Sequence, residues 1–270
     1  MAGLLASACG GGAALLHPAH PLPADAFTAG AGVSGQFTSG RVQREIDDAE
    51  SVAEQPITDA QDARIYLRGL LAEALVAPGV SPWVGARLGI TDAQEAGITY
   101  TGRNVRVDAR HAFVSDQLAL SLGLGASAVL LSPESRAPGA PPANDTELDA
   151  TGWGLDLPVL LGYRDPAGMF DVWAGARGGF ERLSGNLRMM TADGNSTFRA
   201  QATGQRWWGG LLAGASAGVP PLAFRFELAV TYQSLSGSLE SGEPPRVPPT
   251  GDIEGHAWSF APTAGILGKF

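Results

Sequence analysis

The segment 223–236 reads AFRFELAVTYQSLS, and its residues alternate strictly between two kinds of side chain. The even positions are apolar or aromatic: Phe224, Phe226, Leu228, Val230 and Tyr232. The odd positions are small or polar, and two are charged: Arg225, Glu227, Ala229, Thr231 and Gln233. Because successive side chains of a β-strand point to opposite faces, this period of two predicts a strand with one apolar and one polar face.

The same alternation recurs along most of the chain. Its period-two segments lie near 25–37, 81–91, 95–102, 105–114, 118–131, 151–163, 169–183, 204–219, 222–236 and 256–270. The connections between them alternate between short turns, such as 165–168, and long loops over 38–80, 133–150, 184–203 and 237–255, and only the turn at Arg103-Asn104 departs from this order. An even number of antiparallel strands with turns at one end and long loops at the other is typical of transmembrane barrels. We therefore expect an all-β, up-and-down antiparallel transmembrane β-barrel of about ten strands over 25–270.

Composition excludes several other classes of protein. The 270 residues are 44% hydrophobic and 17% charged, and 18 Lys and Arg against 27 Asp and Glu give a net charge of −9. This charge argues against nucleic acid as a partner, because phosphate binding needs a cationic surface. A single cysteine excludes an intramolecular disulfide and every multi-cysteine metal site. No metal cluster, phosphate loop or dinucleotide motif occurs in a fitting context, so we expect no cofactor and no metal.

Aromatic residues give a second signal, independent of the alternation. On three expected strands an aromatic residue begins and ends the apolar face: Phe27 and Phe37, Trp153 and Tyr163, and Phe170 and Phe180. At about 3.3 Å per residue and a tilt near 40°, the common spacing projects to roughly 25 Å, the height of the apolar band of a membrane barrel. We interpret these six residues as aromatic girdles, which makes membrane lipid the expected partner of the outer surface.

One acidic stretch interrupts the alternation and has a helical pattern. Val42, Ile46 and Ala49 share one helical face, and Thr58 or Asp59 can cap a second helix over 60–76, which Pro78 ends. We expect a helical insert at about 41–77, in the first extracellular loop, lying over or in the barrel mouth. Gly69 weakens this prediction, because glycine disfavours a helix interior.

The C-terminal segment continues the apolar face to the last residue. Trp258, Phe260, Ala264, Ile266 and Phe270 are in phase, while Pro262 departs from a regular strand. Together with the alternation, this segment resembles the end of bacterial outer-membrane β-barrel proteins, whose final Phe is read by the barrel-assembly machinery. The resemblance implies that Phe270 is an assembly signal and that the protein lies in the outer membrane of a Gram-negative bacterium.

The N-terminal residues 1–16 are almost wholly small or apolar, which predicts an export signal. Within them, Ala6-Ser7-Ala8-Cys9 resembles the lipobox of bacterial lipoproteins, which makes Cys9 a candidate for lipid anchoring; the alternative is a plain signal with a chance cysteine. His17 to Pro23 is rich in proline, and we interpret it as a linker, so that 1–24 form a signal and linker. Its two histidines could contact a metal, but the prolines prevent the helix that would align them.

If the apolar faces meet lipid, the opposite faces line the lumen. The charged residues on these faces are Arg87, Arg106, Asp108, Arg110, Asp156, Asp171, Arg177, Glu181, Arg206, Arg225 and Glu227. Both signs occur, and charges in a narrow barrel must pair or stay hydrated. We favour a lumen filled by ion pairs over the alternative, a narrow pore whose charged walls set selectivity.

The expected role is that of a non-enzymatic barrel of structural, surface-interaction or narrow-pore type, with no identified small-molecule ligand. A first alternative is a surface hydrolase that uses Asp252, Glu254 or His256 for acid–base chemistry. A second is a soluble, lipocalin-like barrel, in which Leu118 to Leu130 would face inward. The G-x-S-x-G match at 214–218 continues a strand rather than a strand–turn–helix elbow, so we do not interpret it as a nucleophile. His111, near Phe113 on the apolar face, is expected at the membrane interface.

Overall fold

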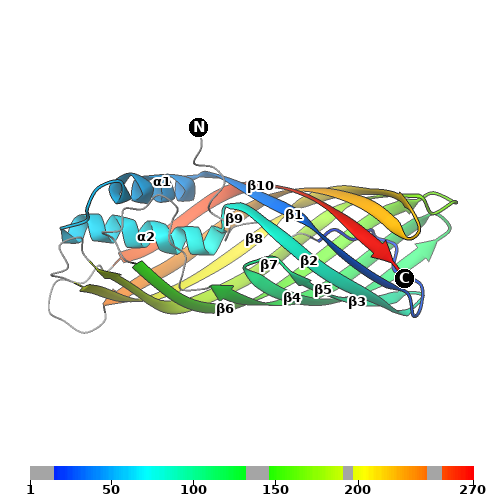
Figure 1. The fold of residues 1–270 in the computed structure, drawn as a ribbon, viewed down its shortest axis with the longest axis horizontal. Helices are drawn as coiled ribbons and strands as arrows, with labels where there is room; N and C mark the ends of the chain where they lie inside the picture. Colours follow the sequence, from blue (N-terminus) through cyan, green and yellow to red (C-terminus); the bar gives the residue numbers. More distant parts are fainter. Residues whose placement is uncertain (1–14, 132–145, 191–196, 242–250) are drawn as a thin grey trace.

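The computed structural model describes residues 15–131, 146–190, 197–241 and 251–270. In these ranges the chain forms ten strands and two helices (Figure 1). The elements, in chain order, are β1 (Phe27–Gly40), α1 (Arg41–Ala53), α2 (Ala60–Val76), β2 (Gly79–Thr91), β3 (Gln94–Tyr100), β4 (Asn104–Ser115), β5 (Leu118–Leu131), β6 (Thr146–Arg164), β7 (Phe170–Met190), β8 (Thr197–Val219), β9 (Leu222–Ser241) and β10 (Gly251–Lys269).

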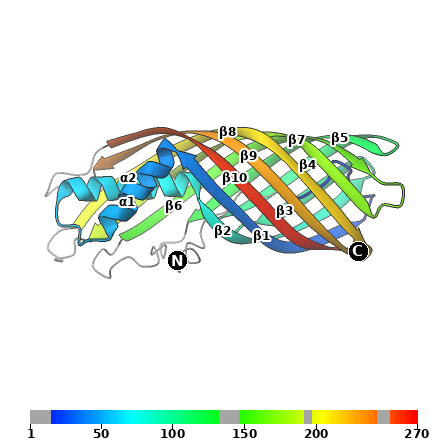
Figure 2. The same cartoon turned by 90° about the horizontal axis from the view of Figure 1, so that it is seen from above.

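The strands close into a barrel in which each strand pairs antiparallel with its neighbours in the chain. The ring is closed by β1 and β10, which pair from Thr28 with Lys269 to Gly40 with Ala257. Both helices lie at the long-loop end of the tilted strands, and the C-terminus lies at the short-turn end (Figure 2). The prediction of an up-and-down barrel of ten strands with a helical first loop is confirmed.

The strands on one side of the barrel are longer than the sequence predicts. β7 runs to Met190 and β8 begins at Thr197, so the predicted loop over 184–203 is wrong. The reason is that the polarity of the wall inverts there. Leu183, Leu187 and Met189 are buried inside, whereas Arg182, Ser184, Asn186 and Arg188 point outward and are exposed. The outer face of these strands is therefore apolar only in the part nearer the short turns, and the strands continue beyond that part toward the long-loop end.

The helical insert begins and ends as local chemistry requires. The Asp59 carboxylate accepts hydrogen bonds from the backbone amides of Gln61 and Asp62 at 2.8 and 2.9 Å, so Asp59 rather than Thr58 caps α2. At the other end Ala77 adopts a left-handed conformation with φ 54°, and its amide donates to the Glu73 carbonyl. Neither helix in the described ranges is long and apolar enough to cross a membrane.

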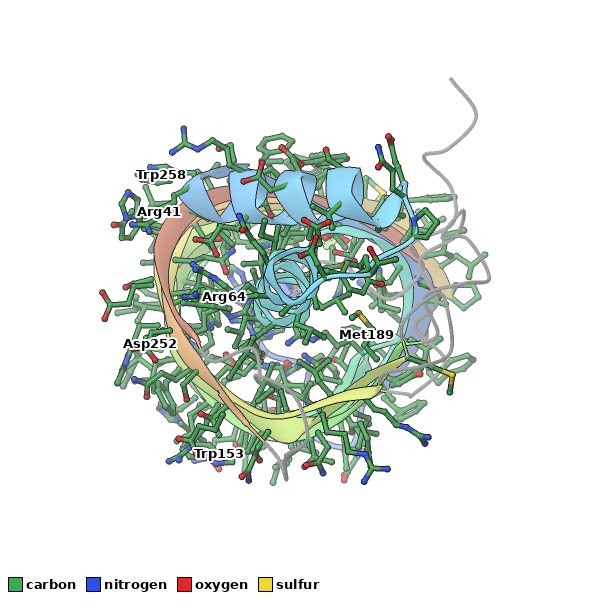
Figure 3. All side chains as sticks on the ribbon, turned by 90° about the vertical axis from the view of Figure 1, so that its left-hand side faces the viewer. Arg41, Arg64, Trp153, Met189, Asp252 and Trp258 are labelled. Carbon is green, nitrogen blue, oxygen red and sulfur yellow. The ribbon has the colours of Figure 1, made fainter. Side chains whose placement is uncertain are left out.

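Helix α2 fills the barrel mouth, and α1 lies across the rim above it (Figure 3). Leu67, Leu71 and Leu75 of α2 are buried with the inward-facing residues of the long strands. These wall residues are Leu183, Leu187, Met189, Ala200, Ala202, Leu235, Leu239, Ile253 and Ala257. The two helices pack closely at Gly69, where a Cβ would collide with the Ala49 side chain, which explains the glycine inside α2.

The N-terminal segment 15–22 enters the barrel from the short-turn end. Its first six residues, Leu15 to His20, are all buried, and Ala19 packs so closely on Gly162 of β6 that a Cβ there would approach the Ala19 side chain to 2.8 Å. The interpretation of His17–Pro23 as a linker is therefore wrong for His17 to His20, which lie buried in the lumen. Proline-rich chain has few backbone donors to satisfy, and the charged wall supplies partners for those that remain.

We expect the cost of a charge on the outer face to depend on its depth. Leu122 lies midway along β5 and is 46% exposed. The change Leu122→Arg should lower the free energy of unfolding of the barrel by about 2–4 kcal/mol, because the guanidinium would lie in hydrocarbon. Leu118→Arg, at the strand end beside Tyr163, should cost about 0–1 kcal/mol. Chemical unfolding in lipid vesicles measures both, and equal, small effects would contradict a lipid-facing wall.

The stability of the helical insert should depend on pH through Glu73 of α2. Burial, and then the negative charge of Glu50, raise the pKa of Glu73 above its ordinary value. The folded insert thus binds a proton more tightly than the unfolded one, so this stability is complete below the ordinary pKa and is lost as pH rises through the raised one. Proteolysis of residues 41–77 should accelerate over that range, and Glu73→Gln should remove the dependence. Glu54→Gln, at an exposed position, is the control and should retain it.

Candidate functional site

All eleven charged residues assigned to the lumen from the sequence lie buried inside the barrel. They are Arg87, Arg106, Asp108, Arg110, Asp156, Asp171, Arg177, Glu181, Arg206, Arg225 and Glu227. Two further charges join them, Glu95 and Arg103. Glu95 could have been identified by its alternation with Ile98 and Tyr100, which face outward. Arg103 lies in the turn between β3 and β4, where no strand periodicity predicts its direction.

Seven of these residues form one continuous chain of alternating charge across the inner wall. It begins with Arg110 on Glu95 at 2.8 Å and passes through Arg87 and Asp108 to Arg106. From Arg106 it continues to Asp156 at 2.8 Å and ends with Arg177 on Asp156 at 3.0 Å. Each inner carboxylate is thus shared by two guanidinium groups. This sharing balances most of the charge that the barrel encloses, as buried ion pairs require.

Glycines in the intervening strands make room for this chain. Arg106 on β4 reaches across β5 to Asp156 on β6, and it passes directly over Gly125. A Cβ at Gly125 would collide with both partners, and one at Gly97 would approach the Arg87 guanidinium to 2.7 Å. The ion pairs therefore depend on the absence of a side chain at these two positions.

A second cluster lies nearer the helical end. Glu181 accepts Arg103 at 2.7 Å and Arg206, its direct neighbour across β7 and β8, at 2.9 Å. Arg206 also donates to the carbonyl of Val76, the last residue of α2, at 3.4 Å, and Gln36 donates to the same carbonyl. The C-terminus of a helix carries partial negative charge, so a cluster of two arginines and one glutamate is a complementary partner for it.

The N-terminal segment is held by the same wall, through its backbone. Glu227 accepts the amides of Leu15 and Leu16 at 3.1 and 3.0 Å, and Trp173 donates to it at 3.2 Å. Arg225 donates to the Leu16 carbonyl at 2.8 Å. Arg110 donates to the carbonyls of Pro18 and His20, and Glu95 accepts the amide of Leu22 at 2.8 Å. The contacts that fix the segment thus involve charged residues that also belong to, or lie beside, the ion-pair chain.

Small cavities remain in the lumen between α2 and the N-terminal segment 15–22. One, of about 60 Å³, is lined by Arg103, Arg177, Arg206, Trp208, Glu227 and Gln233, with the Arg177 guanidinium 5.1 Å from the Trp208 ring centre. Another, of about 20 Å³, lies beside Leu15, Arg87 and Arg225. These volumes fit a few water molecules. In the described ranges, no three His, Cys, Asp or Glu side chains are grouped so that they could hold a metal ion.

The outer wall is apolar over the height of the sequence-assigned girdles. Of these six aromatic residues, Phe27, Phe37, Trp153, Tyr163 and Phe170 are exposed, and Phe180 packs between Trp153 and Trp207 with ring centres 5.4 and 4.6 Å away. Leu118, Leu120, Leu122, Leu124 and Leu130 all point outward and are 42–56% exposed. A soluble, lipocalin-like barrel needs these leucines inside, so that alternative is wrong.

The remaining candidates have the following places. Ser216 is buried within β8, so its G-x-S-x-G match is part of a strand. Asp252 and His256 lie on the outer face of β10, four residues apart, which is about 13 Å along a strand and too far for a hydrogen-bonded pair. His111 packs edge-on against Phe113 at 4.7 Å. Phe270 is 78% exposed and exchanges two backbone hydrogen bonds with Phe27. Cys9 lies outside the described residues.

An apolar exterior bounded by aromatic residues, around an interior of paired charges, defines a transmembrane β-barrel of the outer-membrane type with a filled lumen. No family model matches the chain, and no curated protein matches its sequence.

The solved structures to which this chain is similar include several outer-membrane barrels. With Neisserial surface protein A it shares 13% identity over 91% of this chain and 99% of that one, at a TM-score of 0.33. With the toluene transporter TbuX of Ralstonia pickettii it shares 11% identity over 92% of this chain and 89% of that one, at a TM-score of 0.37. With the outer-membrane protease OmpT of Escherichia coli it shares 7% identity over 91% of this chain and 97% of that one, at a TM-score of 0.34. At these identities and TM-scores, the similarities assign neither an activity nor a ligand to this chain.

Loss of the Glu181 charge should strongly destabilise the barrel. Glu181→Gln leaves Arg103 and Arg206 buried beside one another, and breaking a buried pair in this way costs about 3–5 kcal/mol. The double variant Arg103→Met/Glu181→Gln, which removes one charge of each sign, should recover part of the loss. Glu240→Gln, at an exposed position of β9, is the control and should have almost no effect. An unfolding free energy of Glu181→Gln within about 0.5 kcal/mol of the wild type would contradict the importance of this pair.

Proposed function

We propose that this protein is a closed barrel of the Gram-negative outer membrane, with a structural or surface-interaction role and no enzymatic activity. The observation that carries this proposal is that two segments of the chain fill the lumen from opposite ends. Residues 15–22 occupy the short-turn half, and α2 occupies the mouth. Both are bound by the charged residues that a pore would need to leave free for ions.

The pairing of the charges also favours a closed barrel over a narrow pore. The charge rings of a selective channel face a water-filled path, and their net charge attracts or repels the passing ion. Here each arginine of the seven-residue chain is bound to one or two carboxylates at short distance. The lumen then contributes stability rather than conduction.

The long-loop end supports a role at the cell surface. There β7 to β10 extend beyond the aromatic girdle and have a polar outer face. Helix α2 packs inside this end of the barrel, and α1 lies across the rim. This end is large, ordered by a buried apolar cluster and polar outside. Such a surface suits interactions outside the bilayer.

Three further roles complete the proposal. Phe270, exposed at the end of β10, serves as the assembly signal for the barrel-assembly machinery. The apolar wall binds outer-membrane lipid, and Cys9 is the candidate for a lipid anchor. The alternative for Cys9 is an ordinary export signal, and mass spectrometry of the mature N-terminus distinguishes the two.

Electrical recording in planar bilayers tests the closed barrel. The wild-type protein should give no stable conductance steps. A variant that begins at Pro23 and has residues 41–77 replaced by a short Gly-Ser connection should conduct, because both fillings are removed. Heat-dependent migration on gels first shows that each variant forms a barrel. Reproducible steps from the wild type would contradict the proposal and favour the narrow pore.

A further inference from the structure

A shallow groove of about 380 Å³ lies on the outer face of the barrel, over β7 to β10. It is lined by Arg182, Thr203, Gln205, Ser236, Ser238, Asp252 and Glu254, together with backbone of neighbouring residues. Its volume lies within the range of about 300–1,000 Å³ that is typical of small-molecule sites. The groove is separate from the lumen, because these side chains point away from the barrel interior, as the outward position of Asp252 in Figure 3 shows.

Strand register arranges the groove side chains in two rows. Arg182 is opposite Gln205, Gln205 is opposite Ser236, and Ser236 is opposite Glu254. The adjacent row contains Thr203, Ser238 and Asp252. Gln205 donates to Ser236 at 3.0 Å, and the hydroxyls of Thr203 and Ser238 lie 2.9 Å apart. Hydroxyl and amide groups thus occupy the centre, with carboxylates at the β10 edge and a guanidinium at the β7 edge.

The groove lies directly above the aromatic girdle. Along the strands, Arg182 and Gln205 lie two residues nearer the long-loop end than Phe180 and Trp207, and Ser236 and Glu254 lie four residues nearer that end than Tyr232 and Trp258. At about 3.3 Å per residue and a tilt near 40°, these steps place the groove roughly 5–10 Å above the girdle. This is the headgroup layer of the leaflet that the girdle contacts, so the groove is continuous with the lipid-facing surface.

We propose that this groove binds the saccharide headgroup of an outer-leaflet glycolipid. Sugar rings present hydroxyls that both donate and accept, which matches the Gln, Ser and Thr side chains at the centre of the groove. Trp207, 62% exposed at the lower edge, offers a flat apolar surface to a ring. Two carboxylates against one guanidinium give the lining a net charge of −1, so the contacts that we propose are with sugar hydroxyls and not with phosphate groups. The inference rests on the proposed function, since it requires the girdle to lie in the membrane.

The test compares glycolipid binding by two matched double variants. Gln205→Ala/Ser236→Ala removes the central donors and acceptors of the groove. The control, Gln43→Ala/Ser51→Ala, removes the same residue types from α1, where both are hydrogen-bonded to Asp47. Each protein is placed in phosphatidylcholine nanodiscs and titrated with lipopolysaccharide, and separately with the oligosaccharide released from it. Bound molecules per barrel are counted by native mass spectrometry.

We expect the wild type and the control to bind both probes, and the groove variant to bind each at least about tenfold more weakly, the effect of one or two lost hydrogen bonds. Equal binding by the groove variant would overturn the inference. So would binding of lipopolysaccharide without the oligosaccharide, because contact would then be made by acyl chains. Dimers that dissociate in the groove variant would instead identify the occupant as a second copy of the chain. Failure of the membrane placement on which this inference rests would appear earlier, as a barrel that does not insert into lipid, and failure of the closed barrel would appear as conductance steps in planar bilayers.

Discussion

Charges enclosed by a lipid-facing wall must find partners within the wall, and this constraint governs the structure. The strands place leucine, valine and aromatic residues outward, so their polar residues can only point to the axis. With little room for water in a ten-stranded barrel, an unpaired guanidinium there would be very costly. The protein meets this requirement with carboxylates shared between arginines, and with glycines that let side chains on non-adjacent strands meet.

The same charges organise what fills the barrel. The arginine–glutamate cluster near Arg206 binds the negative end of α2, and the residues around Glu227 and Arg110 bind the backbone of the N-terminal segment. Above this charged layer the wall changes character, because its inner residues become apolar and receive the leucines of α2. Where the outer face is apolar, the barrel therefore places most of its charges inside, and where the outer face is polar, the inner face is largely apolar; both arrangements occur along single strands such as β7.

The features that could be predicted from sequence follow from lipid contact. Alternation predicted the ten strands and the inward direction of residues such as Asp156 and Arg177, and helical spacing with capping residues predicted the two helices in 41–77. The prediction failed where another contact replaces lipid. The strand around Leu187 is apolar on its inner face, so it did not match a pattern built on an apolar exterior. The partners of each charge, and the entry of His17 to His20 into the lumen, depend on register between distant strands, which periodicity within one segment does not contain.

The position of α2 depends on closure of the ring. Its residues precede nine of the ten strands in the chain, yet its neighbours are β8, β9 and β10, and its last carbonyl is bound from β8 and β1. The binding surface for α2 is thus complete only when the final strand has closed the ring against β1. The full set of contacts that hold α2 therefore exists only in the closed ring, which couples the position of this early segment of the chain to its last strands.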